Sequence, residues 1–153
     1  MNRFWYRFVP RNISLIHSGA GERVYNLLET QISAYMGEVF EEICKQFLWH
    51  ENLADRLPIS FRDAGRWWGA NPILKSEQEI DIIAYDDFGA IFCECKWTNS
   101  PVGCDILDRL IEKCRMFSFE HKFYFIFSKS GFTDECKNIA DANIRLICFE
   151  NMF

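Results

Sequence analysis

Several features that would place this protein in a familiar class are missing from its 153 residues. No apolar run approaches the roughly 18 residues that a transmembrane helix needs, and the N-terminus lacks the basic-then-apolar layout of a signal peptide. We therefore expect a cytoplasmic protein with no membrane partner. The sequence contains no G-x-x-x-x-G-K-(S/T) motif, which excludes a P-loop ATP site.

The sequence also lacks the cysteine spacing of a structural metal site. Its seven cysteines are odd in number and never form a C-x-x-C pair, whereas structural zinc sites use paired Cys or His at short spacing. Most of the cysteines fall within apolar stretches, a pattern typical of buried free thiols in a reducing compartment. We therefore expect seven unpaired cysteines.

Positive charge is scarce as well, because 17 Lys and Arg face 22 Asp and Glu and leave a formal net charge of −5. This balance does not indicate a nucleic-acid binder, although local patches decide such binding once salt screens exposed charges beyond about 8 Å. Trp67 and Trp68 lie in a short predicted strand, where alternation would expose one ring for stacking on bases, but core packing is the preferred interpretation. Five scattered basic residues are interpreted as a solvated face. They are Arg62, Arg66, Arg109, Lys113 and Arg115.

Apolar residues, in contrast, are abundant: 49% of the chain is hydrophobic and 16% aromatic, enough for a packed core. Because strands that are apolar on both sides must be covered twice, the expected fold class is α/β (α+β), a central mixed β-sheet flanked by helices on both faces. The 3.6-residue period predicts helices at 22–49, 102–117 and 134–142. Apolar runs predict strands at 78–85, 90–97, 122–128 and 144–149, preceded by one strand in the less regular stretch where 57–61 and 66–68 are the two candidates.

No internal repeat, low-complexity tract or clear linker divides the chain, so we expect a single domain, residues 1–153. Residues 1–20 mix aromatic and basic side chains and are expected to form an N-terminal arm that continues from an upstream domain. Gly37 lies inside the first predicted helix, where glycine costs about 1 kcal/mol against alanine. It would permit the close approach of another element.

Charged residues interrupt the two apolar strands at 78–85 and 90–97. The loop between them would have two or four residues, and either length places Asp81 opposite Glu94. Directly paired residues share a face, with Cβ atoms about 4.5–5.5 Å apart. Lys96 lies on that face as well, because side chains alternate along a strand.

Two carboxylates side by side repel each other, and burying them is costly unless a cation pairs with them. Oxygen ligands from one or two carboxylates, completed by water and phosphate, are what Mg²⁺ prefers. Lys96 would then neutralise charge on a scissile phosphate or orient an attacking water. The side chain of Cys95 points to the opposite face, but its backbone carbonyl remains available to a metal. The competing interpretation is a salt bridge in which Lys96 neutralises Glu94 and Asp81 lies exposed at an edge.

Asp81 followed by Glu94-Cys95-Lys96 resembles the D…(D/E)-x-K signature of the PD-(D/E)XK, or restriction-endonuclease-like, superfamily. Gly37-Glu38-Val39-Phe40-Glu41 is similar to the G-x-x-F-E motif on the first helix of that superfamily. The predicted order helix–strand–strand–strand–helix–strand is the one that its core requires. One departure is that Ile80 stands where the superfamily usually has proline.

This resemblance implies a set of catalytic residues. Asp81 and Glu94 would bind Mg²⁺ or Mn²⁺, with the backbone carbonyl of Cys95 as a further ligand. Lys96 would act on the water or the phosphate, and Glu41 would support the metal site from the first helix.

A second resemblance covers most of the chain. The segments FWYRFV, GEVFEE, RWWG, EIDIIA, CECKWTNSPV and FSKSGFT together look like the uncharacterised C-terminal domain of archaeal-type AAA ATPases. In that family the domain follows a P-loop ATPase module and a winged helix. The resemblance therefore implies an AAA ATPase partner in cis or in trans, and this chain would be either an excised fragment or a freestanding version.

Three functions are compatible with these residues. The first is a Mg²⁺-dependent DNA endonuclease that hydrolyses phosphodiesters, which the intact Asp81–Glu94–Lys96 set favours. The second is an inactive nuclease-fold module that regulates or docks an AAA ATPase, or binds DNA without cleavage, which the acidic balance favours. A third, an RNA-directed or toxin-like nuclease, is not separated from the first by the sequence, so DNA is the expected partner and RNA the alternative.

Overall fold

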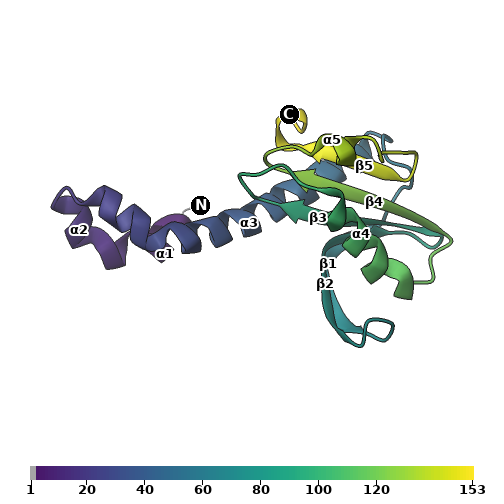
Figure 1. Ribbon diagram of the computed structural model, residues 1–153, viewed down its shortest axis with the longest axis horizontal. Coiled ribbons are helices and arrows are strands. Elements are labelled where there is room, and N and C mark those ends of the chain that lie inside the picture. Colours follow the sequence, from purple (N-terminus) through teal and green to yellow (C-terminus); the bar gives the residue numbers. More distant parts are fainter. Residues whose placement is uncertain (1–2) are drawn as a thin grey trace. The chain divides into compact units, whose positions relative to one another are not determined.

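The computed structural model describes residues 3–153 of the chain (Figure 1). The α-helices are α1 (Arg3–Phe8), α2 (Ile13–His17), α3 (Gly21–Leu53), α4 (Cys104–Lys113) and α5 (Asp134–Lys137). The strands are β1 (Asp63–Asn71), β2 (Ser76–Tyr85), β3 (Gly89–Lys96), β4 (His121–Ser128) and β5 (Ile144–Cys148). Short 3₁₀ turns occupy Pro10–Asn12, Cys114–Met116 and Phe149–Asn151.

The chain divides into two compact units, Met1–Met36 and Gly37–Phe153, and the boundary falls inside α3. In the first unit, Phe4, Phe8 and Tyr35 form mutual ring contacts with centroids 5.0–5.9 Å apart. Only Phe8 and Val24 are buried among its described residues. The second unit contains the β-sheet and is the part of the chain in which the predicted site lies.

The five strands form one mixed sheet in the order β1-β2-β3-β4-β5. The β1–β2 and β2–β3 pairs are antiparallel, whereas β3–β4 and β4–β5 are parallel. Figure 1 shows β1 and β2 continuing together as a hairpin past the rest of the sheet. The expected mixed sheet is confirmed, and so is the order helix–strand–strand–strand–helix–strand, in α3, β1–β3, α4 and β4.

Helices cover both faces of the sheet, as expected, because each face carries its own apolar cluster. On one face, Phe40, Cys44 and Leu48 of α3 pack against sheet residues such as Ile82 and Cys93. On the other face, Leu107 and Leu110 of α4 and Cys136 of α5 pack against Ile80 and Phe92. The sheet is therefore buried twice, which explains why its strands are apolar on both sides.

Two predicted elements differ from the structure. Residues 57–61 form no strand, because Pro58 lacks a backbone N–H and the amide and carbonyl of Phe61 are both bonded by the Asn52 side chain of α3. The helix expected at 134–142 ends at Lys137. Asp141 accepts a hydrogen bond from the Asn143 amide, an Asx-type turn that competes with helix.

The β2–β3 register expected from the loop is confirmed for four pairs, from Ile82–Cys93 to Tyr85–Ala90. The ladder ends there, so Asp81 and Glu94 stand one position beyond its last pair. On its other side β2 is bulged: Gly65 pairs with Ile83 and Trp67 with Ile80, so that Asp81 and Ile82 together oppose the single residue Arg66.

All seven cysteines are free thiols, as expected, and four of them are buried. Burial raises the pKa of Cys114 to about 12 and that of Cys136 to about 11, so both thiols stay protonated. Across residues 3–153, no helix combines the length and apolar character needed to cross a membrane.

Candidate metal centre

Asp81 lies in the β2 bulge, and its carboxylate is directed at the main chain of β3. Its Oδ2 accepts a hydrogen bond of 2.7 Å from the amide of Cys95. A bulge turns side chains away from the regular alternation of a strand, so the expectation that Asp81 and Glu94 share a face by alternation alone does not apply here. The two residues are brought together instead because the Asp81 side chain replaces the missing ladder bond.

Glu94 is held by two lysines. It is only 8% exposed and lies on β3, one position beyond the last pair of the ladder with β2. Lys96 donates to its Oε1 at 2.6 Å. Lys113, the last residue of α4, lies 3.4 Å from its Oε2. Both carboxylate oxygens therefore face an ammonium group, which is how a buried carboxylate escapes the cost of an unpaired charge.

Glu41 and Glu79 are joined through Arg66, the residue opposite the bulge. Arg66 donates to the Glu41 carboxylate from one guanidinium nitrogen and contacts Glu79 from another at 2.9 Å. The site thus combines four acids with three bases: Glu41, Glu79, Asp81 and Glu94 with Arg66, Lys96 and Lys113.

The pKa shifts in this cluster indicate that the charged form of Asp81 is disfavoured. Burial and the neighbouring Glu94 carboxylate raise the pKa of Asp81 to about 6, although the Cys95 amide opposes that shift. Burial acts to lower the pKa of Lys96, but the hydrogen bond to Glu94 and the negative charges of Glu94 and Asp81 together outweigh it, so the pKa lies above its ordinary value. Lys96 is therefore an ammonium at neutral pH, and a further cation beside Asp81 would stabilise the charged form of its carboxylate.

The chemistry of these donors fits a hard divalent cation. Mg²⁺ is commonly held by one or two carboxylates, with water and phosphate oxygens in its other positions. Asp81 offers Oδ1, which no donor bonds in the described chain, and Glu94 retains lone pairs beyond its two lysine contacts. Residues 3–153 contain no group of three or more Cys, His, Asp or Glu arranged to hold a metal, so any ion here would rely on backbone and solvent oxygens as well.

The structure brings Asp81, Glu94, Lys96 and Cys95 together and places Glu41 within electrostatic range of Asp81. Sequence reasoning missed two members of this network, because Arg66 and Lys113 were interpreted as solvated. The bulge that directs Arg66 leaves no mark in sequence. Lys113 did leave one, since it follows Leu110 by three residues and so lies beside the apolar stripe of its helix.

The two tryptophans of β1 divide as alternation predicts. Trp67 packs on Phe117 with ring centroids 5.2 Å apart, whereas Trp68 is 71% exposed and pairs with Glu79 on β2. A surface pocket beside Trp68 is lined by Arg66, Glu77, Gln78 and Glu79. It therefore shares Arg66 and Glu79 with the charged network.

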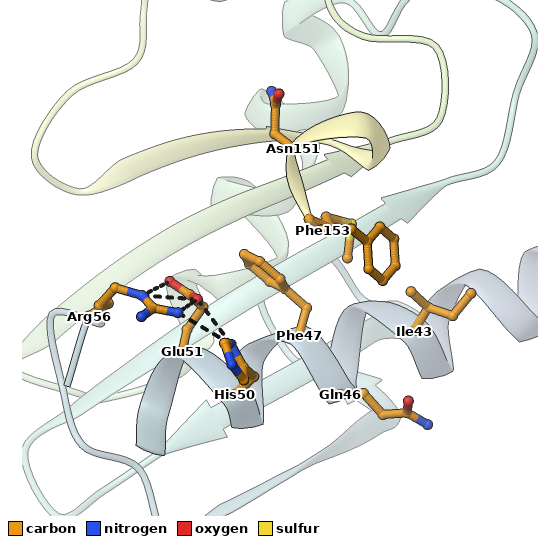
Figure 2. Close-up of a pocket in the computed structure, with 9 residues that line it drawn as sticks. Ile43, Gln46, Phe47, His50, Glu51, Arg56, Asn151 and Phe153 are labelled. Carbon is orange, nitrogen blue, oxygen red and sulfur yellow. Dashed lines mark hydrogen bonds and ion pairs between the residues drawn. The ribbon is translucent and has the colours of Figure 1, made fainter. Parts of the chain in front are cut away.

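A larger pocket, of about 790 Å³, lies between α3 and the C-terminal residues (Figure 2). Ile43, Phe47 and Phe153 give it apolar walls. Figure 2 shows Arg56 directed at Glu51 and His50 at the other end of the pocket. The hydrogen bond from Arg56 lowers the pKa of Glu51, so the charge of this carboxylate is already neutralised by a side chain. The pocket contains none of the residues around Asp81.

Comparisons with known proteins identify a family but no activity. The model of the DUF234 family, described as "Archaea bacterial proteins of unknown function", matches residues 5–109. An "Uncharacterized protein MJECL04" of Methanocaldococcus jannaschii is 32% identical over 114 residues, which cover 72% of this chain and 22% of that protein. This chain therefore spans about a fifth of the length of that relative.

Two solved structures are similar to this chain at low sequence identity. The protein of unknown function AF1548 is 19% identical with a TM-score of 0.49, over 71% of this chain and 58% of that chain. The DNA modification-dependent restriction endonuclease AspBHI is 17% identical with a TM-score of 0.40, over 83% of this chain and 33% of that chain.

Proposed function

This chain belongs to the DUF234 family of archaeal and bacterial proteins of unknown function, and for its charged centre we propose Mg²⁺- or Mn²⁺-dependent hydrolysis of phosphodiester bonds, with DNA as the substrate. The observation that carries the proposal is the convergence of Asp81, Glu94 and Lys96 where the β2–β3 ladder ends. The raised pKa of Asp81 supports it, because a divalent cation would relieve the repulsion from Glu94 that helps to cause it.

Each residue has a defined part in the proposed chemistry. Asp81 and Glu94 would hold the metal together with the backbone carbonyl of Cys95. A bound divalent cation supplies charge neutralisation at the scissile phosphate and makes water more acidic. Lys96 would orient the attacking water or contact a non-bridging phosphate oxygen, and it is already fixed by Glu94 at 2.6 Å. As water attacks phosphorus it gives up one proton to solvent, the bond from phosphorus to the leaving oxygen breaks, and that oxygen takes up one proton from solvent.

Glu41 would support this centre without touching the substrate. Its carboxylate is occupied by Arg66, and its charge adds to the forces that raise the pKa of Asp81. Neutralising Glu41 would therefore shift the protonation of Asp81, and with it the metal affinity, while leaving both proposed ligands in place.

The proposal is tested by metal binding and cleavage in the same set of variants. We expect calorimetry to detect Mn²⁺ binding by wild type, and loss of that binding in Asp81→Ala and Glu94→Ala. Cleavage of supercoiled and branched DNA should be lost in both variants and in Lys96→Ala. Asp87→Ala is the matched control, because Asp87 is a 67% exposed carboxylate of the β2–β3 loop whose ion pair is with Arg62, outside the charged centre. No binding of Mn²⁺ at millimolar concentration would rule out the enzyme.

One observation favours a second candidate, an inactive module that regulates or docks an AAA ATPase. Lys96 and Lys113 together occupy both oxygens of Glu94, an arrangement that is complete as a buried salt bridge. If wild type binds DNA or an ATPase domain but no metal, this second function replaces the first. Single-stranded RNA in the cleavage assay separates a ribonuclease from a deoxyribonuclease.

A further inference from the structure

Lys113 links the two strands that carry the proposed metal ligands. From the end of α4 its Nζ donates to the backbone carbonyl of Glu79 on β2 at 3.0 Å. The same atom lies 3.4 Å from Oε2 of Glu94 on β3. Its side chain is only 20% exposed, so solvent weakens these contacts little.

This link occurs where the main-chain ladder no longer joins β2 to β3. The last ladder pair is Ile82–Cys93, and both Asp81 and Glu94 lie beyond it. Past that pair, the hydrogen bond from the Cys95 amide to Asp81 is the other connection between these strands in the described chain. Lys96 adds nothing across the gap, because it bonds Glu94 on its own strand.

The backbone of Lys113 is itself fixed. Asn71, which is 1% exposed, donates from its side-chain amide to the Lys113 carbonyl at 3.0 Å. The carbonyl oxygen of the same Asn71 side chain accepts from the amides of Ile73 and Leu74, both at 3.0 Å. Asn71 thereby joins the end of α4 to the β1–β2 turn. The main chain from which the Lys113 side chain extends is therefore fixed in position.

We propose that Lys113 is a positioning residue that sets the orientation of Glu94 and its separation from Asp81. The inference rests on the proposed function, since it concerns how the metal centre is assembled. Lys113 acts through Glu94 and does not touch the substrate. With Lys96 on Oε1 and Lys113 on Oε2, the carboxylate plane is fixed at both oxygens, and the remaining lone pairs stay available to a metal.

The experiment compares two half-buried lysines, Lys113 of α4 and Lys122 of β4, whose ammonium groups both donate to main-chain carbonyls. Lys113→Met removes the bridge and keeps most of the apolar side chain. Lys122→Met is the matched control, because Lys122 also donates to a backbone carbonyl, that of Cys114, at 3.1 Å and contacts no acid of the centre. Calorimetry measures the Mn²⁺ affinity of the assembled centre. The hydrogen-exchange rate of the Cys95 amide measures, without any metal, how firmly β2 and β3 are joined.

We expect Lys113→Met to weaken Mn²⁺ binding by about 10- to 100-fold, the usual cost of losing a group that orients a metal ligand. The Cys95 amide should exchange faster, whereas Lys122→Met should change neither quantity. Lys113→Arg keeps the charge and several donors, so it should fold even if the methionine variant does not, and it should recover part of the affinity.

The outcomes separate this inference from the proposed function. Wild-type Mn²⁺ affinity in folded Lys113→Met, or equal losses in Lys113→Met and Lys122→Met, would overturn the positioning role. If Lys113→Met does not fold, Lys113→Gln takes its place as the variant without the charge, and wild-type Mn²⁺ affinity and Cys95 exchange in it overturn the role. If wild type itself binds no Mn²⁺, the proposed function fails, and with it the role of Lys113 at a metal. Unchanged Cys95 exchange would then also remove the role in joining the strands.

Discussion

Asp81 shows how a single carboxylate can be kept in an unfavourable state by its surroundings. It is half-buried, it faces the charge of Glu94, and one backbone amide offsets part of that cost. Folding therefore favours its protonated form, and its pKa of about 6 lies above the roughly 3.9 of an unfolded chain. The stability that Asp81 contributes is present below pH 4 and is lost as the pH rises through 6.

Asp81→Asn should accordingly stabilise the metal-free protein more at pH 8 than at pH 4. Asparagine carries no charge and still offers an oxygen to the Cys95 amide, so the hydrogen bond survives. The difference between the two pH values should be roughly 1–3 kcal/mol in the free energy of unfolding, measured with urea in the presence of a chelator. Asp87→Asn, in an exposed loop, is the control. A gain that does not depend on pH would contradict the burial argument.

A residue of the site could be predicted from the sequence when its partners lie on the same hairpin. Asp81, Glu94 and Lys96 were found from two neighbouring strands, because a hairpin register can be counted from its loop. Arg66 was missed because a bulge decides its direction. Lys113 was missed because its partner lies 19 positions earlier, on another element.

At the scale of elements, the sequence predicted the existence of α3 correctly but the role of one residue within it wrongly. The period predicted a helix at 22–49, and the helix runs from Gly21 to Leu53. The expectation that Gly37 permits a close approach is wrong, because a Cβ added there would meet nothing within 4 Å. Gly89, in contrast, is a site of close approach: an added Cβ would lie 3.1 Å from Ile59 and 3.2 Å from the His121 carbonyl.

Two alanine substitutions test this contrast. Gly37→Ala should stabilise the protein by about 0.5–1 kcal/mol, because alanine loses less conformational entropy in a helix and meets no obstacle. Gly89→Ala should destabilise it, because the backbone carbonyl of His121 would have to move. Thermal unfolding followed by circular dichroism measures both. A destabilising Gly37→Ala would mean that the position is needed for packing.

At the scale of the whole molecule, the chain contains two units that differ in how many apolar side chains they bury. Both apolar clusters of the sheet consist of residues from Phe40 onward. Residues 1–36 bury little and carry four arginines against two glutamates, so the acidic excess of the chain lies in residues 37–153. Phe40, Cys44 and Leu48 pack the second half of α3 against the sheet.

A fragment of residues 37–153 should therefore fold alone. We expect it to keep the near-UV circular dichroism of the sheet aromatics and a cooperative thermal transition within about 5 °C of the full chain, since a loss below 1 kcal/mol shifts a domain of this size by a few degrees. A fragment with secondary structure but no cooperative transition would show that residues 1–36 complete the core.

The sequence by itself determined the mixed sheet, its covering on both faces, the β2–β3 register and the three central charges. Each of these follows from the periodicity of side chains within one element or from the length of a short loop. Both are set by residues that are close together in the sequence. Only the tertiary structure decided where that ladder ends, that a bulge turns Asp81 toward the Cys95 amide, and that Lys113 reaches Glu94 from another element. These features depend on packing between segments that lie far apart in the sequence. The spacing of residues along the chain does not reveal which of those segments pack together.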